Sequence, residues 1–159
     1  MKGPAHVIAP PAAPRGERLG MYRVRSIIDR FVVRREVREH ARAVGFSRLG
    51  CEELVVVASE LCTNIVKYGV QGTLAVERLE DPRRGQGLLM CAEDCGPPFF
   101  DFSRAIEDGS DDRGEIPPES RFGRLGIAAG LGAVQRFSHV LWHEPFDGGK
   151  RVCAARYVR

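Results

Sequence analysis

Three polar side chains are spaced so that a helix would bring them together. Glu60, Asn64 and Lys67 stand four and three residues apart, which places them on one face of an α-helix. A carboxylate, a carboxamide and an ammonium group in one place can accept a proton, hold Mg²⁺ and neutralise phosphate. A solvated helix face is the plainer interpretation, and spacing alone favours it.

A second candidate for chemistry is Asp94, which follows an apolar run and precedes Cys95, Gly96 and Pro97. A carboxylate at the end of a strand can accept a hydrogen bond from an exocyclic amine such as that of adenine. The glycine would let a flat base approach the backbone. Taken alone, this pattern is also typical of an ordinary turn.

A third candidate is a glycine-rich segment that leads into a predicted helix. Gly123, Gly126, Gly130 and Gly132 precede the apolar residue Val134. Free backbone N–H groups and the helix dipole favour a phosphate at such a place. The segment is not a P-loop, because no Gly-Lys-Ser/Thr follows it. Close packing of a helix on a sheet through small residues is the alternative.

Two amphipathic helices are predicted before these glycines. Apolar residues recur every three to four positions in each, with charged residues between them, which is the pattern of a half-buried helix. The second helix carries Glu60, Asn64 and Lys67. The predicted boundary residues are Asp29 (N-cap) and Gly45 (C-cap) for the first helix, and Ser47 (N-cap) and Gly69 (stop) for the second.

The remaining segments predict strands, two further helices and a loop. Alternation and β-rich composition indicate five strands, and a loop rich in Asp, Gly and Pro indicates mobility. We therefore expect an α+β fold, a two-layer sandwich in which helices cover one face of a mixed, mostly antiparallel sheet. The predicted strands are 21–27, 72–79, 88–93, 139–143 and 151–158, with a turn at 81–87, helices at 102–107 and 125–137, and the loop at 108–120.

Composition indicates one domain behind a tail. The chain has 159 residues, of which 43% are hydrophobic and 28% charged, which suits a single soluble core. Residues 1–18 hold four of the ten prolines and predict a flexible tail, with the domain at 19–159. The net charge is +3 without a long basic run, so charge does not point to nucleic acid.

The sequence predicts neither a membrane protein nor a secreted one. No apolar stretch approaches the roughly 18 residues that span a bilayer, and no signal-peptide core follows Lys2. A cytoplasmic protein is the expectation. Four of the five cysteines, Cys51, Cys62, Cys91 and Cys153, lie in apolar runs, and we expect them to be core thiols rather than disulfides.

Taken together and in order, three segments carry a resemblance to a known family. They read SELCTNIVKYG, AEDCGPP and GRLGIAAGLGAVQRF. The first resembles the N box of the GHKL ATPase superfamily, the second its Asp-x-Gly-x-Gly box and the third its later glycine box. Within the superfamily the chain is most similar to short anti-sigma serine kinases of the stressosome switch type, and the AIEDG stretch at 105–109 adds to that similarity. A Bergerat-type fold is implied.

The resemblance implies a function by position. The cofactors would be ATP and Mg²⁺, and residues 109–122 would form the ATP lid. The substrate would be a serine on a STAS-domain antagonist protein, and its phosphorylation would free a sigma factor or activate a phosphatase. The implied roles are Glu60 as general base, Asn64 as Mg²⁺ ligand, Lys67 near the phosphates, Asp94 on adenine, and Gly96, Gly126 and Gly130 along the nucleotide.

Three positions depart from the family's pattern. Pro98 and Ala128 stand where glycines are usual, and Lys150 stands where a threonine is usual. We expect weaker ATP binding than is usual for the family, partly offset if Lys150 attracts phosphate. The alternative function is a nucleotide-poor binding module of the same fold that sequesters a STAS protein, a sigma factor or a phosphatase. A detached histidine-kinase catalytic domain is a weaker alternative, and a homodimer is left open.

Overall fold

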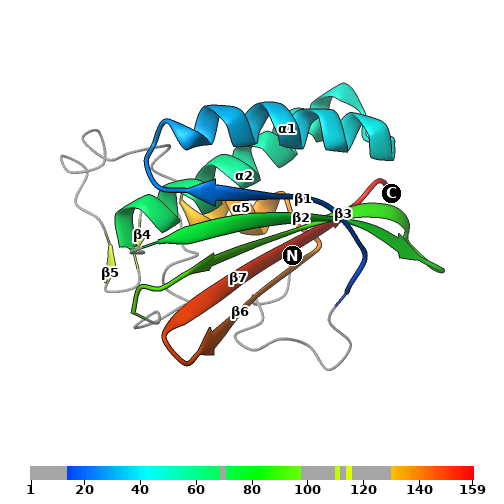
Figure 1. Ribbon diagram of the computed structural model, residues 1–159. Helices are drawn as coiled ribbons and strands as arrows, with labels where there is room; N and C mark the ends of the chain where they lie inside the picture. The colour runs from blue at the N-terminus through cyan, green and yellow to red at the C-terminus, as the bar shows by residue number, and fades with distance from the viewer. Residues whose placement is uncertain (1–13, 69–70, 98–109, 112–113, 116–129) are drawn as a thin grey trace.

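The computed structural model describes residues 14–68, 71–97, 110–111, 114–115 and 130–159. Five antiparallel strands form one sheet in the order β1-β2-β3-β7-β6, and the helices lie together on one side of it (Figure 1). The strands are β1 Glu17–Val24, β2 Gly72–Asp81, β3 Gly85–Asp94, β6 Val140–Phe146 and β7 Gly149–Tyr157. The helices are α1 Asp29–Val44, α2 Arg48–Tyr68 and α5 Leu131–Arg136.

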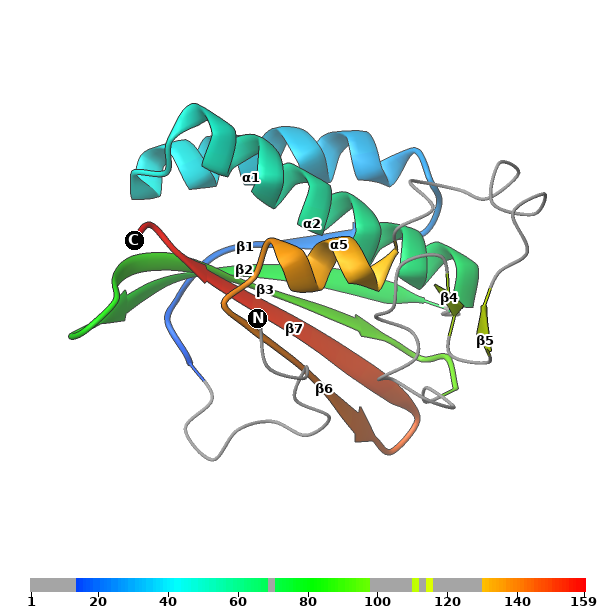
Figure 2. The same cartoon turned by 180° about the vertical axis from the view of Figure 1, so that it is seen from behind.

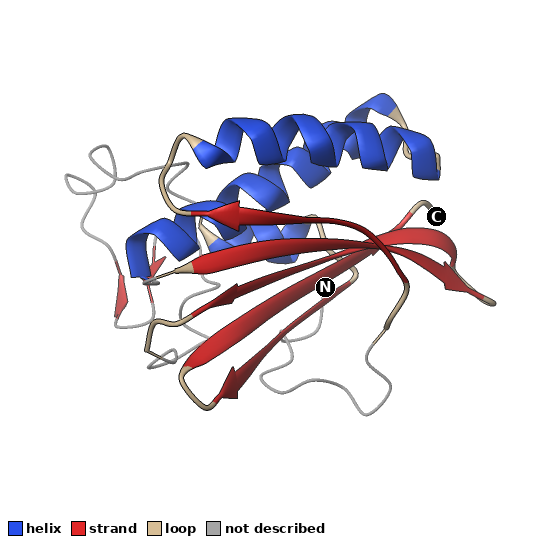
Figure 3. Cartoon of the chain, viewed as in Figure 1, coloured by secondary structure: helices blue, strands red, loops and turns tan. Residues whose placement is uncertain are grey.

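The predicted fold class is confirmed. The coloured view in Figure 3 separates a helical layer from a layer of strands, and Figure 2 shows from behind that α5 lies beside α2 in the helical layer. All strand pairings among the described residues are antiparallel. The helices cover the side of the sheet that carries the larger apolar core, as expected of a two-layer α+β domain.

The first helix ends as predicted but begins differently. Gly45 has φ +111° and its N–H donates to two carbonyls of the last turn, which is the usual C-terminal glycine cap. The N-cap is Ile28 rather than Asp29. The Asp29 carboxylate instead accepts the backbone N–H groups of Arg25 and Ser26 at 2.7 and 3.2 Å. These two bonds lower the pKa of Asp29 and fix the turn between β1 and α1.

The second helix begins as predicted and runs antiparallel to the first. The Ser47 hydroxyl accepts a hydrogen bond from the backbone N–H three residues on, at 3.0 Å. Arg38 of α1 pairs with Glu52 near the start of α2 at 2.7 Å. Arg30, two turns earlier in α1, reaches Thr63 near the end of α2 at 3.3 Å. The beginning of α1 therefore lies beside the end of α2.

The predicted hairpin between the second and third strands is confirmed, but its turn is shorter than predicted. The Asp81 carboxylate accepts the N–H groups of Arg83 and Arg84 at 2.7 and 2.8 Å. Gly85 then takes φ +77°, a conformation that glycine adopts without strain. Because these bonds close the chain within residues 82–84, both strands extend further toward the turn than their alternation indicates.

The first strand starts earlier than predicted. It begins at Glu17 and ends at Val24, whereas alternation placed it at 21–27. Pairing with β2 extends it backwards, since Glu17 lies opposite Arg78. The division of the chain into a tail and a domain stays a prediction, because residues 1–13 are outside the described part.

The central strands are apolar on both sides of the sheet. Their helix side belongs to the main core, and their opposite side, which we call the open side, carries a second buried cluster. This double burial explains why residues 88–92 form a continuous apolar run instead of alternating. The second cluster contains Leu79, Leu89, Trp142, Cys153, Ala155 and Tyr157.

The prediction for the cysteines is half wrong. Cys51 and Cys62 are buried free thiols as expected, and burial raises the pKa of Cys62 to about 12. Cys91 and Cys153, however, form a disulfide. They are register partners on β3 and β7, and their Cα atoms are 4.2 Å apart. The pairing of strands so distant in sequence creates this contact, and the apolar runs around each cysteine do not reveal it.

The C-terminal half agrees with prediction in its last two strands, but part of the predicted loop is paired. Two strands close the chain, β6 and β7, each longer than expected. Within the predicted loop at 108–120, β4 (Ser110–Asp111) and β5 (Gly114–Glu115) pair with each other. The predicted helix at 102–107 lies outside the described residues, as does the first part of the one at 125–137. No described helix is long and apolar enough to cross a bilayer.

Candidate functional site

The predicted polar face of α2 is present. Glu60 is only 3% exposed, so its carboxylate is held inside the protein rather than on a solvated surface. Asn64 follows one turn later, and its buried Nδ2 has no hydrogen-bond partner among the described residues. Lys67 lies in the last turn of the helix. A buried polar atom without a partner costs free energy unless a ligand satisfies it, so the solvated-face interpretation does not hold for this part of α2.

A close backbone approach brings this part of α2 to the end of the sheet that carries Asp94. Gly72 is the register partner of Asp94 on β2. A Cβ atom on Gly72 would lie 2.3 Å from Cγ2 of Ile65 and 2.8 Å from the carbonyl oxygen of Glu93. Only glycine fits so small a space. Ile65 is next to Asn64 in the helix, so the two candidate groups lie at one end of the domain.

Asp94 is buried and carries an ion pair. Its register partner on β7 is Lys150, and the Lys150 Nζ lies 2.8 Å from its Oδ1. The two side chains are only 4% and 6% exposed, lysine first. The sequence-based expectation that Lys150 attracts phosphate is therefore corrected. The register of β3 and β7 turns this ammonium toward Asp94, and a buried ammonium is stable only beside an opposite charge.

The carboxylate of Asp94 keeps one oxygen for another donor. Its Oδ1 accepts both the Lys150 ammonium and the backbone N–H of Gly96, each at 2.8 Å. Neither of these bonds uses Oδ2, and no described residue donates to that oxygen. An exocyclic amine of a base would fit this acceptor. Gly96 thus has a structural part in the site, because its N–H fixes the carboxylate.

Sequence reasoning missed one residue beside the site, Arg30. Its Nη1 donates to the Thr63 hydroxyl at 3.3 Å, and that hydroxyl donates to the Ser59 carbonyl at 2.8 Å. Thr63 precedes Asn64, so a guanidinium group lies next to the α2 face. The Arg30 Nε is buried and has no partner among the described residues. Nothing in the sequence near Arg30 reveals this, because the antiparallel packing of α1 and α2 creates it.

The glycines predicted to line a nucleotide are only partly described. Gly130 precedes α5 and has φ +52°. Residues with a side chain rarely adopt such a positive φ. Gly126, Pro98 and Ala128 lie outside the described residues. Of the expected phosphate end of the site, the described residues include the polar face of α2 and Gly130.

The described residues suit Mg²⁺ only in combination with a ligand. They contain no cluster of three or more His, Cys, Asp or Glu side chains that could hold a metal ion. Mg²⁺ commonly takes one or two protein ligands and completes its shell with water and substrate phosphates. Asn64 would be such a ligand. Its buried Nδ2 has no partner among the described residues and is a donor that suits a phosphate oxygen, whereas Oδ2 of Asp94 is an acceptor that suits a base amine.

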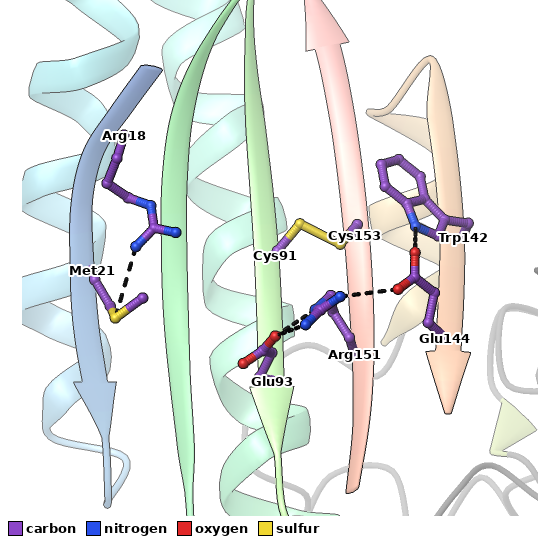
Figure 4. A network of polar contacts seen from close by, with 8 residues as sticks. All are labelled: Arg18, Met21, Cys91, Glu93, Trp142, Glu144, Arg151 and Cys153. Atoms are coloured by element: carbon purple, nitrogen blue, oxygen red, sulfur yellow. Dashed lines mark hydrogen bonds and ion pairs between the residues drawn. A yellow bond between two sulfur atoms is a disulfide. The ribbon is translucent and has the colours of Figure 1, made fainter. Parts of the chain in front are cut away.

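The open side of the sheet carries a separate polar network. Figure 4 shows Arg151 of β7 between Glu93 of β3 and Glu144 of β6, with the Trp142 indole donating to Glu144. Arg151 pairs with Glu144 at 3.0 Å, and the indole bond is also 3.0 Å. A cavity of about 260 Å³ lies beside this network. Because Glu93 and Asp94 are consecutive on a strand, their side chains lie on opposite sides of the sheet.

Comparison with known proteins decides the family. A model of the histidine kinase-like ATPase domain matches residues 23–140, which includes both the α2 face and Asp94. The chain belongs to this family. It is 32% identical over 99 residues to the serine/threonine-protein kinase RsbT of Bacillus subtilis (strain 168). That alignment covers 62% of this chain and 65% of the kinase, slightly less than two thirds of the relative's length.

Family membership confirms the resemblance and indicates the general kind of ligand that the family binds. The histidine kinase-like ATPase domain is the GHKL type that the three motifs indicate, and it implies ATP binding at the level of the family. The relative is a kinase by name. The family match and the similarity to a kinase both agree with the two buried carboxylates, Glu60 on α2 and Asp94 at the end of β3.

Proposed function

We propose that the protein is an ATP-dependent serine-protein kinase of a partner-switching pathway. Its substrate would be a STAS-domain antagonist protein, through which it regulates a sigma factor or a phosphatase. The observation that carries the proposal is the approach of Gly72 to Ile65, since it brings the α2 face and Asp94 to one end of the domain. The similarity to a serine/threonine-protein kinase supports the reaction class.

Each described site residue has a part in this proposal. Glu60 takes the proton from the incoming serine hydroxyl, as a general base must, and its side chain is itself buried. Asn64 holds Mg²⁺, Lys67 neutralises phosphate, and Asp94 accepts the base amine. Bound ATP would supply the phosphoryl group. Gly96, Gly126 and Gly130 would allow the backbone to approach the nucleotide closely.

An exposed apolar patch supports a protein as the substrate. Ile28, Phe31 and Val32, at the beginning of α1, are 70%, 61% and 48% exposed. This patch lies next to the site, because Arg30 of the same turn contacts Thr63. Clustered exposed apolar side chains commonly mark protein interfaces, and aromatic residues dominate their energetics. A STAS-domain protein docked on this patch would reach the site with its serine.

The nucleotide part is tested by calorimetry with ATP, with and without Mg²⁺. We expect the wild type to bind ATP more tightly when Mg²⁺ is present. Asn64→Ala should bind ATP equally with and without the ion, because its metal ligand is gone. If the wild type binds ATP with the same affinity in the presence and absence of Mg²⁺, the proposed role of Asn64 is contradicted.

The kinase part is tested by label transfer to STAS-domain proteins of the same genome. Glu60→Gln keeps the shape of the side chain and should reduce transfer by about 10²–10⁴-fold without loss of ATP binding. Glu53→Gln is the matched control, since Glu53 lies two turns earlier on α2 and pairs with Arg156. We expect normal transfer from the control. A wild type that binds a STAS protein but labels none would favour the second candidate function, the binding module.

The docking patch has its own matched pair of variants. Phe31→Ser should weaken binding of the STAS partner about tenfold or more, because a large apolar contact is lost. Leu49→Ser is the control, because Leu49 is 69% exposed but lies at the beginning of α2, far along the helix from Thr63. Equal weakening by both variants would place the partner elsewhere.

A further inference from the structure

Lys150 and Asp94 form a buried ion pair that limits which hydrogen bonds Asp94 can offer a ligand. The two residues face each other across β3 and β7, and both are almost fully buried. Lys150 and the Gly96 N–H donate to the same oxygen, Oδ1, each at 2.8 Å. The carboxylate is therefore held by two donors on one of its oxygens, and neither donor uses Oδ2.

A carboxylate with only one oxygen left to accept hydrogen bonds should bind adenine and guanine differently. Adenine presents an amine next to a ring acceptor, and one carboxylate oxygen satisfies that amine. Guanine presents two adjacent N–H donors, which a carboxylate binds best with both oxygens in parallel. Occupation of Oδ1 removes the second of these bonds, so guanine would leave a buried N–H without its best partner.

We propose that Lys150 is a positioning residue that sets base specificity: it occupies Oδ1 of Asp94 and leaves Oδ2 as a single acceptor, so that the site takes an adenine nucleotide and rejects a guanine nucleotide. The proposal rests on the proposed function, because it requires that Asp94 meets the base. It assigns the choice between the two purines to the pair of residues and not to Asp94 alone.

A purely structural Lys150 makes a different prediction. If the ammonium only compensated a buried charge, its removal would loosen the end of the sheet and weaken all nucleotides alike. A positioning role requires that the ratio of the two affinities changes. The neighbouring Arg151 provides the comparison, since it occupies the next position on β7 and points to the open side (Figure 4).

The test measures the affinities for ATP and for GTP by calorimetry on the full chain, without a protein partner. We expect the wild type to bind GTP at least tenfold more weakly than ATP. In Lys150→Met the ratio should fall about tenfold, because Oδ1 becomes able to accept a second N–H. Arg151→Met should leave both affinities unchanged. A thermal melt of each variant confirms that it is folded.

A second variant decides the matter if Lys150→Met does not fold. Lys150→Arg keeps the positive charge, but a guanidinium group binds a carboxylate through both oxygens. ATP affinity should then fall about tenfold with a folded protein. An unchanged ATP affinity in Lys150→Arg, or an unchanged ratio in Lys150→Met, overturns the inference alone. A wild type that binds neither nucleotide overturns it together with the proposed function.

Discussion

Two neighbouring ion pairs on the same two strands show what burial does to charge. Asp94–Lys150 and Glu93–Arg151 occupy consecutive positions of the β3–β7 ladder. The first pair lies on the helix side with exposures of 6% and 4%, and the second lies on the open side with exposures of 39% and 29%. Each pair joins a carboxylate to a basic side chain, and burial is the main difference between them.

The comparison explains why only one of the pairs belongs to the candidate site. In a half-exposed pair, water can replace either partner at a small cost in free energy. The pair therefore contributes little to stability. A buried pair must stay complete, because either charge left alone inside the protein is costly. Such a pair holds one geometry, and a fixed carboxylate is what recognition of a base requires.

The largest expected effect comes from breaking the buried pair. Lys150→Met should lower the free energy of unfolding by about 3–5 kcal/mol, because Asp94 would remain buried without its partner. Urea denaturation measures this. In Asp94→Asn/Lys150→Met the lone charge is gone, and the double variant should be more stable than Lys150→Met. A double variant that is less stable would show that the charge pairing is not what the lysine supplies.

The next effect concerns the covalent link between the same strands. Cys91 and Cys153 are 62 residues apart in sequence, and in the chain-entropy model a loop of that length contributes about 4 kcal/mol. Dithiothreitol should therefore lower the stability of the wild type by about 2–4 kcal/mol.

The matched variant for the disulfide is Cys91→Ser/Cys153→Ser. It should be less stable than the oxidised wild type and should not respond to the reductant. The thiols can be counted at the same time. Unfolded, unreduced protein should show the three thiols of Cys51, Cys62 and Cys95, and a count of five would mean that the disulfide is not present.

A titratable group on the helix side should add a dependence on pH. His143 is 8% exposed, and burial lowers its pKa from the ordinary 6.5. Between its folded and unfolded pKa values the unfolded chain binds more protons, so stability is complete above about pH 6.5 and falls below it. Thermal melts between pH 8 and pH 5 should show this fall. His143→Gln should reduce it, and an unchanged fall would assign the dependence to other groups.

The smallest effect should come from the open-side pair. Arg151→Met removes contacts with Glu93 and Glu144, but the pairs are partly solvated, and the expected loss is about 0.2–1 kcal/mol. The loss should shrink further in high salt. A loss as large as that of Lys150→Met would remove the contrast between the two sides of the sheet.

Most of the features that depend on interactions within a few residues were predicted correctly from local sequence patterns. The helix around Asn64, its Ser47 cap, the Gly45 cap and the hairpin strands follow from periodicity and turn chemistry within a few residues. Asp29 was assigned the wrong role, because its carboxylate could satisfy either the helix or the preceding turn. Sequence does not show which of two local hydrogen-bonding choices is taken.

Long-range pairing accounts for what the sequence did not reveal. The Cys91–Cys153 disulfide and the Asp94–Lys150 pair both depend on the register between β3 and β7, which no pattern within either strand encodes. Lys150 precedes the predicted strand at 151–158 and stands between Gly149 and Arg151, so its local sequence does not indicate a buried charge. The roles of Glu60, Asn64 and Lys67 stay predictions that rest on the family's motif.

The position of β7 in the sheet also has a consequence for how the chain folds during synthesis. β7 is the last of the described strands in sequence, yet it lies between β3 and β6. Asp94 is translated 56 residues before Lys150. A nascent chain can therefore form the α1–α2 pair and the β2–β3 hairpin from nearby segments, whereas the end of the sheet that carries Asp94 waits for the distant strand. The candidate site is completed only when β7 leaves the ribosome.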